Sequence, residues 1–302
     1  MIFMSTTEKQ RLDFHKEISK NNFKTYLLFL LFFALVFGLA YLLKLIFAAS
    51  GFGILFFAGI IAIIYALVGY YTGDKIVLSV SKAKPADPKK YLYLHNVVEG
   101  LAIAAGVPKP KVYIINDPSP NAFATGRDPK HSSIAVTSGL LETLNREELE
   151  GVISHEMSHI LNNDIKVMTM VSVLFGIVSI IADIGFRGIL FGGGGNDDNK
   201  GNFLLMLIAI VFLILAPLFA MLIQMAISRN REYLADSTGA KLTRYPKGLA
   251  DALLKISKYS QPVKVADQGT AHLYISDPLK KVSSWFSTHP PIEERVKRLL
   301  AM

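Results

Sequence analysis

The sequence predicts a mainly helical membrane protein with a small β-sheet, an α+β fold that contains about four transmembrane helices. Hydrophobic residues make up 51% of the 302 residues, and the mean hydropathy of +0.38 exceeds that of ordinary soluble domains. Charged residues account for 19% of the chain and are concentrated outside four long apolar runs. These runs approach or exceed the ~20 apolar helical residues that a bilayer core requires.

The first two runs predict a transmembrane hairpin over residues 26–72, preceded by a cytoplasmic segment, residues 1–25. Residues 26–43 and 52–72 carry no charge, and a short link around Ser50 joins them. A cleaved signal peptide is the alternative for the first run. The run is longer than the apolar part of a signal peptide and begins far from the N-terminus, which favours a retained helix.

The third run predicts a transmembrane span over residues 165–191. Residues 167–182 are uncharged, but Asp183 and Arg187 interrupt the run before its apolar character resumes. These two residues are spaced i, i+4, so they can pair with each other on one helix face. The sequence alone does not decide whether this span crosses the whole bilayer.

The fourth run predicts a transmembrane span over residues 203–227, which are uncharged throughout. Pro217 lies within it, and a membrane helix tolerates proline as a kink where a soluble helix usually ends. Residues 192–202, rich in glycine and asparagine, predict the external loop between the third and fourth spans.

The distribution of lysine and arginine predicts the orientation. Cations cluster before the first span and after the second: Lys9, Arg11, Lys16, Lys20, Lys24, Lys75, Lys82, Lys84, Lys89 and Lys90. Such flanks are typical of the cytoplasmic side, so both termini are expected there in a multi-pass protein of the inner (cytoplasmic) membrane. The formal net charge of +8 does not predict nucleic-acid binding, because the cations form no compact basic arm.

Residues 73–164 and 228–302 are long enough to form one compact cytoplasmic domain from two segments of the chain. Residues 90–105 have helical apolar spacing, whereas residues 112–115 and 132–137 have the composition and alternation of strands. Asn145 and Glu148 form a capping-box pattern, which predicts that a helix begins at Arg146.

That helix contains His155-Glu156-Met157-Ser158-His159, the H-E-x-x-H pattern. Histidines at i and i+4 lie on one helix face about 5–6 Å apart, so two imidazoles can bind one ion. Glu156 is turned about 100° from His155, beside the ion, where it can accept a proton from an activated water. The alternative is two surface histidines on an ordinary helix. A third ligand decides between them, and without cysteine it has to be a histidine or a carboxylate.

Glu232 is the candidate third ligand. It follows the fourth apolar run as closely as His159 precedes the third, so the two share one side of the membrane if both runs cross or neither does. Asp236, one turn later, is expected to accept a hydrogen bond from a ligating imidazole. The alternative is that both acids are solvated and pair with nearby arginines. Two histidines and one carboxylate suit one zinc ion per chain, with a position left for water.

The sequence resembles the HtpX-type membrane zinc endopeptidases of bacteria and archaea, relatives of the CAAX prenyl proteases. The resemblance covers nearly the whole chain and rests on four motifs in order: Pro120-Asn121-Ala122-Phe123-Ala124-Thr125-Gly126, the H-E-x-x-H pattern, residues 228–236, and Ser287-Thr288-His289-Pro290-Pro291 followed by Arg295. It implies a gluzincin-like metalloprotease domain in which His155, His159 and Glu232 bind zinc. Glu156 would be the general base and later the proton donor.

The resemblance also implies roles around the metal. Asn121, Ala122, Phe123 and Ala124 would form an edge strand that pairs with an extended polypeptide substrate. His289 would stabilise the oxyanion, with Arg295 supporting it. Without the resemblance, residues 121–124 would be interpreted as an ordinary turn and strand. His289 would be interpreted as a histidine in an ordered loop. The implied partners are membrane lipid and misfolded or damaged membrane proteins, cut on the cytoplasmic side.

Two other classes of protein are compatible with parts of the pattern. A catalytically silent membrane scaffold would use zinc only to join its cytoplasmic segments, but a structural site needs no base such as Glu156. A channel or transporter would be expected to carry ionisable residues in several spans, whereas only Asp183 and Arg187 interrupt one run. Prenyl-protease activity is not expected, because a prenyl protease would have more spans around a large chamber than the four predicted here.

Overall fold

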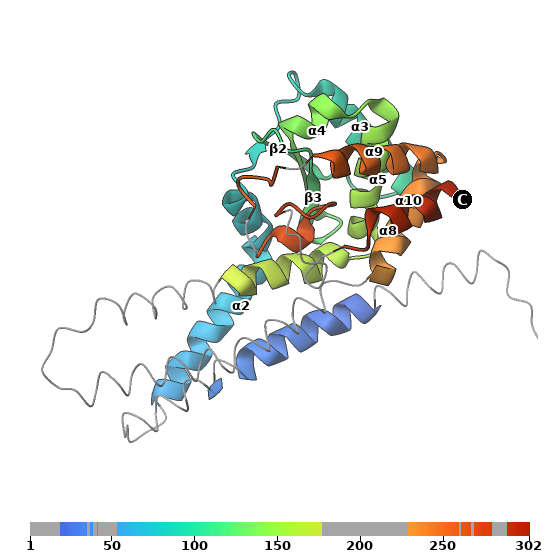
Figure 1. Ribbon diagram of the computed structural model, residues 1–302. Helices are drawn as coiled ribbons and strands as arrows, with labels where there is room; N and C mark the ends of the chain where they lie inside the picture. Colours follow the sequence, from blue (N-terminus) through green and yellow to red (C-terminus); the bar gives the residue numbers. More distant parts are fainter. Residues whose placement is uncertain are drawn as a thin grey trace, which may run out of the picture.

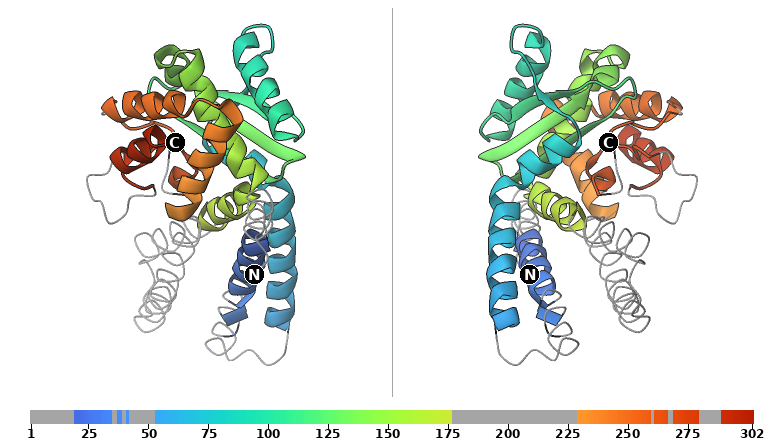
Figure 2. Two further views of the ribbon diagram at one scale, coloured as in Figure 1. Left: turned by 90° about the vertical axis from the view of Figure 1, so that its right-hand side faces the viewer. Right: turned by 90° about the vertical axis from the view of Figure 1, so that its left-hand side faces the viewer.

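The computed structural model describes residues 19–34, 37–38, 41, 53–176, 229–259, 261–266, 269–279 and 289–302. Helices surround a small sheet to form a body, and two helices project from it side by side (Figures 1 and 2). The predicted mainly helical fold with a small sheet is confirmed. The predicted external loop, residues 192–202, and the fourth span, residues 203–227, lie outside the described residues.

The two projecting helices are residues 19–34 and α2, Gly53–Val80. Phe29 packs on Tyr70 and Phe32 on Tyr65, so the two helices run antiparallel. Within α2, Gly59–Val80 is long and apolar enough to cross a membrane, and it is the one such helix among the described residues. The helix continues past residue 72, the predicted end of the hairpin.

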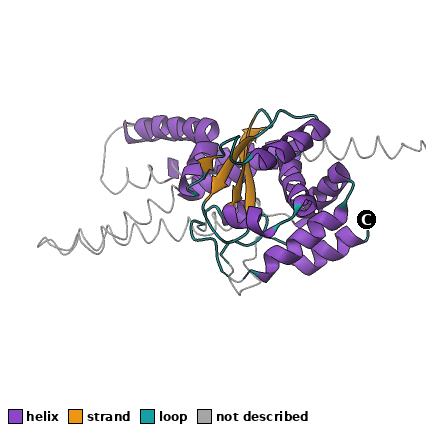
Figure 3. Cartoon of the chain, turned by 90° about the horizontal axis from the view of Figure 1, so that it is seen from above, coloured by secondary structure: helices purple, strands orange, loops and turns teal. Residues whose placement is uncertain are grey.

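The sheet has the strand order β1-β2-β4-β3 and is mixed. Its strands are β1 (Lys84–Pro85), β2 (Lys111–Ile115), β3 (Ala122–Asp128) and β4 (His131–Thr137). Strands β2 and β4 pair in parallel, and the other two pairs are antiparallel. The strands predicted at residues 112–115 and 132–137 are confirmed, and β3 is an edge strand. Figure 3 shows the strands together among the helices.

The remaining elements of the body are helical. They are α3 (Leu92–Ala105), α4 (Ser138–Thr143), α5 (Arg146–Leu161), α8 (Arg229–Thr243), α9 (Pro246–Lys258), the short η1 (Ala271–Leu273) and α10 (Ile292–Leu300); residues 164–176 are also helical. The predicted helix at residues 90–105 begins two residues later, at Leu92.

Helix α5 begins where the capping box predicted. The Asn145 side chain accepts a hydrogen bond from the Glu148 amide at 3.0 Å, and the Glu148 carboxylate accepts one from the Asn145 amide at 2.8 Å. These bonds satisfy amides that the first turn of a helix leaves without partners. Most of its apolar residues, including Val152, Ile153 and Met157, are fully buried, so α5 is the central helix of the core.

Helix α8 approaches α5 closely because a glycine lies at their contact. A Cβ atom added at Gly239 would lie 2.9 Å from Ser154 Oγ and 3.0 Å from the His155 backbone nitrogen. Any larger side chain would therefore push the two helices apart. The absent side chain lets α8, which carries Glu232 and Asp236, lie directly against the H-E-x-x-H residues of α5.

Candidate metal centre

Three potential ligands converge inside the body. His155 and His159 lie one turn apart on α5, Glu232 lies on α8, and all three are buried. Their ligand atoms lie within 4.8 Å of one another, the one such cluster among the described residues. Helix periodicity brings the histidines together, and the α5–α8 contact adds the carboxylate.

The separations fit a tetrahedral ion. The two Nε2 atoms are 3.2 Å apart, and the Glu232 carboxylate oxygens lie 3.6 Å from His155 Nε2 and 3.6 Å from His159 Nε2. Ligand atoms bound at ~2.1 Å around a tetrahedral zinc would be about 3.4 Å apart. The three side chains therefore match the spacing that one zinc ion requires.

The outer nitrogen of each imidazole faces a carboxylate. His155 Nδ1 lies 2.9 Å from Asp236, and His159 Nδ1 lies 3.0 Å from Asp164. Each Nδ1 is therefore assigned the ring hydrogen, and each Nε2 turns its lone pair toward the other Nε2 and toward Glu232. Three electron-rich atoms gathered in a buried space could hold a cation among them.

Arg295 holds the carboxylate behind His155. It donates two hydrogen bonds to Asp236, at 2.9 and 2.7 Å, and a third to the Ile275 carbonyl. Burial opposes ionisation of Asp236, but Arg295 and His155 outweigh it and lower the pKa of Asp236 to about 2. Arg295 thus supports His155 through Asp236, whereas the resemblance implied support for His289.

The electrostatics keep the two imidazoles distinct. Burial lowers the pKa of His155 to about 4, so at neutral pH this ring is neutral, as a metal ligand must be. For His159, burial is outweighed by the hydrogen bond to Asp164 and the charge of Glu232, which raise its pKa. A proton and a metal ion therefore compete for His159.

Asp164 is a part of the site that sequence reasoning missed. It lies just after the Asn162-Asn163 turn that follows α5, and its carboxylate is held by Asn21, whose amide donates to it at 2.6 Å. The available signal was an acidic residue shortly after the second histidine of the motif. No local pattern indicated Asn21, because 143 positions of sequence separate it from Asp164.

Glu156 lies on α5 beside this cluster and is itself almost completely buried. Neither of its carboxylate oxygens accepts a hydrogen bond from a described side chain. Burial raises the pKa of Glu156 to about 7, while the charge of His159 and the nearby Ala124 backbone act in the opposite direction. A carboxyl group near neutral pKa can both accept and release a proton at neutral pH.

His289 contacts Glu232 directly. Its Nδ1 lies 2.8 Å from one oxygen of that carboxylate. Burial opposes ionisation of Glu232, but the charge and hydrogen bond of His289 and the charges of His159 and His155 together lower its pKa well below the usual range. His289 therefore belongs to the surroundings of the candidate ligand.

Strand β3 lies at the edge of the sheet, but part of that edge is covered. The Ala122 carbonyl accepts a hydrogen bond from the Ile275 amide at 2.9 Å, and Phe123 forms an isolated bridge with Tyr274. Asn121 precedes the strand and donates to the Ser276 carbonyl. All four residues predicted for substrate pairing, Asn121, Ala122, Phe123 and Ala124, are buried.

The metal-binding geometry is accompanied by a match to a known family. Residues 88–302 match the model of peptidase family M48. The chain belongs to peptidase family M48. This M48 chain is 50% identical over 288 residues to the protease HtpX homolog of Caldanaerobacter subterraneus subsp. tengcongensis, a match that covers 94% of this chain and 96% of that relative.

Further relatives agree. The protease HtpX homolog of Thermoanaerobacter pseudethanolicus is 47% identical over 288 residues, again covering 94% of this chain and 96% of the relative. The crystal structure of S. mikatae Ste24p matches with a TM-score of 0.50 and 21% identity, covering 97% of this chain and 67% of that chain. The Ste24p match shows a shared fold. The HtpX-type resemblance is confirmed by the M48 family match and the HtpX homologues, and family membership supports a membrane metalloprotease acting on polypeptides.

The contact between Asp236 and His155 leads to a measurable prediction. Asp236→Asn is expected to lower zinc affinity by about 10- to 100-fold, because the amide cannot supply the negative charge that holds the ring and balances Arg295. Competition titration against a chelating dye measures this affinity. The control is Asp251→Asn on α9, whose carboxylate forms an exposed pair with Lys247. Equal affinities in both variants would contradict the assignment.

Proposed function

We propose that this M48 chain is a zinc-dependent endopeptidase anchored in the inner (cytoplasmic) membrane by about four transmembrane helices. The observation that carries the proposal is the Glu156 carboxyl group. It is buried, accepts no hydrogen bond from a described side chain and lies beside three converging metal-ligand atoms. A purely structural metal site has no need of such a group.

His155, His159 and Glu232 would hold the zinc ion. When bound, zinc polarises a peptide carbonyl and makes a nearby water more acidic. Glu156 accepts the proton that this water loses on attacking the carbonyl carbon, and then gives it to the amine nitrogen as the peptide C–N bond breaks. The pKa of about 7 that burial gives Glu156 suits both proton transfers.

The substrate is proposed to pair with the edge of β3. Alternate residues of a strand direct their backbone groups to the same edge. On the outer edge of β3, two of these residues already form hydrogen bonds within the protein. The Ala122 carbonyl bonds to Ile275, and the Gly126 amide donates to Thr169. Ala124 lies between them, close to Glu156, and the Phe123–Tyr274 bridge covers this part of the edge. An extended substrate that displaced the Tyr274 segment there would lie beside the base. His289, next to Glu232, is the candidate for stabilising the oxyanion.

The proposed biological role is quality control of misfolded or damaged membrane proteins. Backbone pairing at a strand edge depends little on substrate sequence, which suits a protease with many substrates. The exposed apolar face of α2 supports anchorage next to such substrates, since Phe56, Phe57 and Ile61 are each more than 60% exposed.

Cleavage of an unfolded protein tests the assignment. Detergent-purified chain is expected to cut casein, to stop when a chelator removes the metal, and to recover when zinc is restored. Chain that retains one zinc but cuts neither casein nor a damaged membrane protein would favour the silent scaffold.

The four-span arrangement is tested by labelling from each side of the membrane. The chain has no cysteine, so single cysteines can be introduced without removing others. We expect position 197, which lies outside the described residues, to be labelled only from outside and Lys241 only from the cytoplasm. Lys241 is exposed, whereas neighbouring Ala240 is buried. Labelling of both positions from the same side would contradict four spans.

A further inference from the structure

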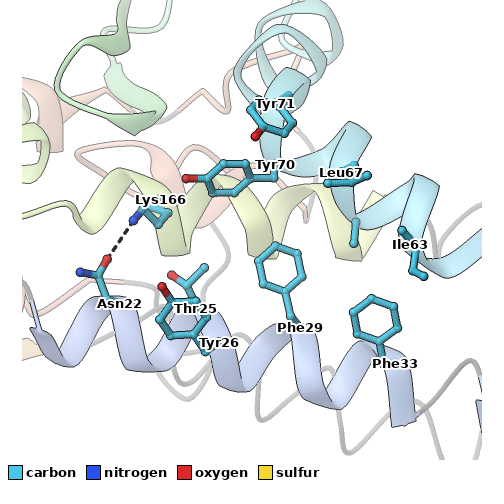
Figure 4. A pocket seen from close by; sticks show the side chains of 11 residues that line it. Asn22, Thr25, Tyr26, Phe29, Phe33, Ile63, Leu67, Tyr70, Tyr71 and Lys166 are labelled. Carbon is cyan, nitrogen blue, oxygen red and sulfur yellow. Dashed lines mark hydrogen bonds between the residues drawn. The ribbon is translucent and has the colours of Figure 1, made fainter.

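A groove of about 490 Å³ lies between the two projecting helices and the helical residues 164–176 (Figure 4). This volume falls within the ~300–1,000 Å³ of typical ligand pockets. It is lined by Asn22, Thr25, Tyr26, Phe29, Phe33, Ile63, Ala66, Leu67, Tyr70, Tyr71 and Lys166. It is separate from the metal centre, because none of the ligands or the base lines it.

The groove is polar at one end and apolar at the other. Lys166 lies at the polar end, where its amine donates to the Asn22 side chain at 2.8 Å, and Figure 4 shows Phe29, Phe33 and Ile63 toward the opposite end. Among the described residues that line the groove, Lys166 is the one charged group, and none is acidic. A positive end followed by an aromatic wall matches an amphiphile with a negative head.

Two regular helix faces form the walls. Asn22, Tyr26, Phe29 and Phe33 are spaced i, i+4, i+7 and i+11, and so lie along one side of their helix. At 1.5 Å per residue this wall is about 16 Å long, long enough to contact much of an extended acyl chain.

The polar end of the groove is held in shape by a buried hydrogen bond. Asn21, only 2% exposed, donates to Asp164 at 2.6 Å and to the Asn162 carbonyl at 3.0 Å. These bonds tie the first projecting helix to the start of residues 164–176, next to Asn22 and Lys166. The pocket is therefore formed before any ligand enters, which lowers the cost of binding.

A second cation lies near the rim. Arg127 stacks over the Tyr71 ring at 5.1 Å from its centroid and donates to the Tyr71 carbonyl at 3.3 Å. Asp128 lies 3.6 Å from Arg127 and offsets part of its charge. Lys166 is thus the principal positive group for a ligand inside the groove.

We propose that this groove binds an anionic phospholipid, with the phosphate at Lys166 and one acyl chain along Phe29 and Phe33. The inference rests on the proposed membrane anchorage. Charge complementarity selects an anionic headgroup, and the exposed apolar face of α2 continues from the groove wall at Ile63 and Leu67 toward the surrounding lipid.

Lipid titration tests the proposal. Full-length protein is purified, stripped of lipid and titrated with phosphatidylglycerol or phosphatidylcholine of identical acyl chains, and bound lipid is counted by native mass spectrometry. Wild-type protein is expected to prefer phosphatidylglycerol, and Lys166→Gln to reduce this preference about fivefold. Lys75→Gln removes the same charge from an exposed position on α2 outside the groove and should leave the preference unchanged.

A second variant tests the apolar part of the groove. Leu67 is 52% exposed and tolerates a larger side chain, so Leu67→Trp should narrow the groove and weaken both lipids without unfolding the protein. Equal lipid preference in Lys166→Gln and wild type would overturn the proposal. The proposal would also be overturned if inorganic phosphate alone displaced the bound lipid. The same holds if an apolar peptide displaced it whereas added phosphatidylglycerol did not.

Alkaline carbonate extraction of membranes separates this inference from the proposed anchorage. Release of wild-type protein into the wash would refute the anchorage and the lipid site with it. Retention of both wild type and Lys166→Gln, together with unchanged lipid preference, would refute the lipid site alone.

Discussion

Glu156→Gln is expected to lower the rate of peptide cleavage by about 10³-fold or more while the chain keeps its metal and its fold. Glutamine has nearly the same shape as glutamate but cannot accept the proton of the attacking water. No described side chain donates a hydrogen bond to the wild-type carboxylate, so the substitution breaks no side-chain hydrogen bond among these residues. The neutral amide also avoids the cost of placing a charge in a buried position.

Three measurements are needed on the same preparation: the initial rate of casein cleavage, the zinc content and the thermal unfolding temperature. The matched control is Glu150→Gln, which lies on the same helix but forms an exposed ion pair with Arg146. The control should be fully active. A Glu156→Gln chain that retains more than about a tenth of the wild-type rate would refute the general-base role, since such groups contribute at least ~10²-fold.

Local patterns predicted the parts of the structure that local physics determines. The capping box fixed the beginning of α5 because its two hydrogen bonds join residues three positions apart. The H-E-x-x-H spacing brought His155 and His159 together because one helical turn determines their separation. The prediction that Glu232 joins the two histidines required one further inference, namely that both segments lie on the same side of the membrane.

The contacts that the sequence did not reveal join distant parts of the chain. Arg295 bonds to Asp236 across 59 positions, and Asn21 to Asp164 across 143. Such pairs are selected when packed elements bring them together, and no periodicity marks them. The hydrogen bond from the Ile275 amide to the Ala122 carbonyl, at the edge of β3, likewise joins distant parts of the chain and has no local sequence signal. The resemblance implied that Arg295 supports His289, whereas the structure places Arg295 against Asp236, because a motif does not specify which side chain an arginine contacts.

Glu232→Ala is expected to have the second large effect, a loss of zinc affinity that exceeds the ~10- to 100-fold expected for Asp236→Asn, together with loss of cleavage. Glu232 is the anionic member of the proposed ligand set, and its pKa is held well below the usual range, so it is ionised at neutral pH. Without it, two neutral imidazoles would have to hold a divalent cation in a buried site. The remaining positive charge would then lack its nearest counter-charge, which a low-dielectric interior makes costly.

Zinc content after extensive dialysis, followed by titration back to saturation, distinguishes this variant from Glu156→Gln. Glu156→Gln should retain zinc without cleavage, whereas Glu232→Ala should lose both, and Glu293→Ala, at an exposed position on α10, should lose neither. If Glu232→Ala kept zinc at wild-type affinity, the third ligand would have to be another acid near the histidines. Asp164 would then be the first alternative, because its carboxylate already lies 3.0 Å from His159 Nδ1. The His159 ring would have to rotate before Asp164 could reach the ion. A loss of zinc affinity in Glu232→Ala that exceeds the ~10- to 100-fold loss expected for Asp164→Asn would therefore assign the carboxylate ligand to α8.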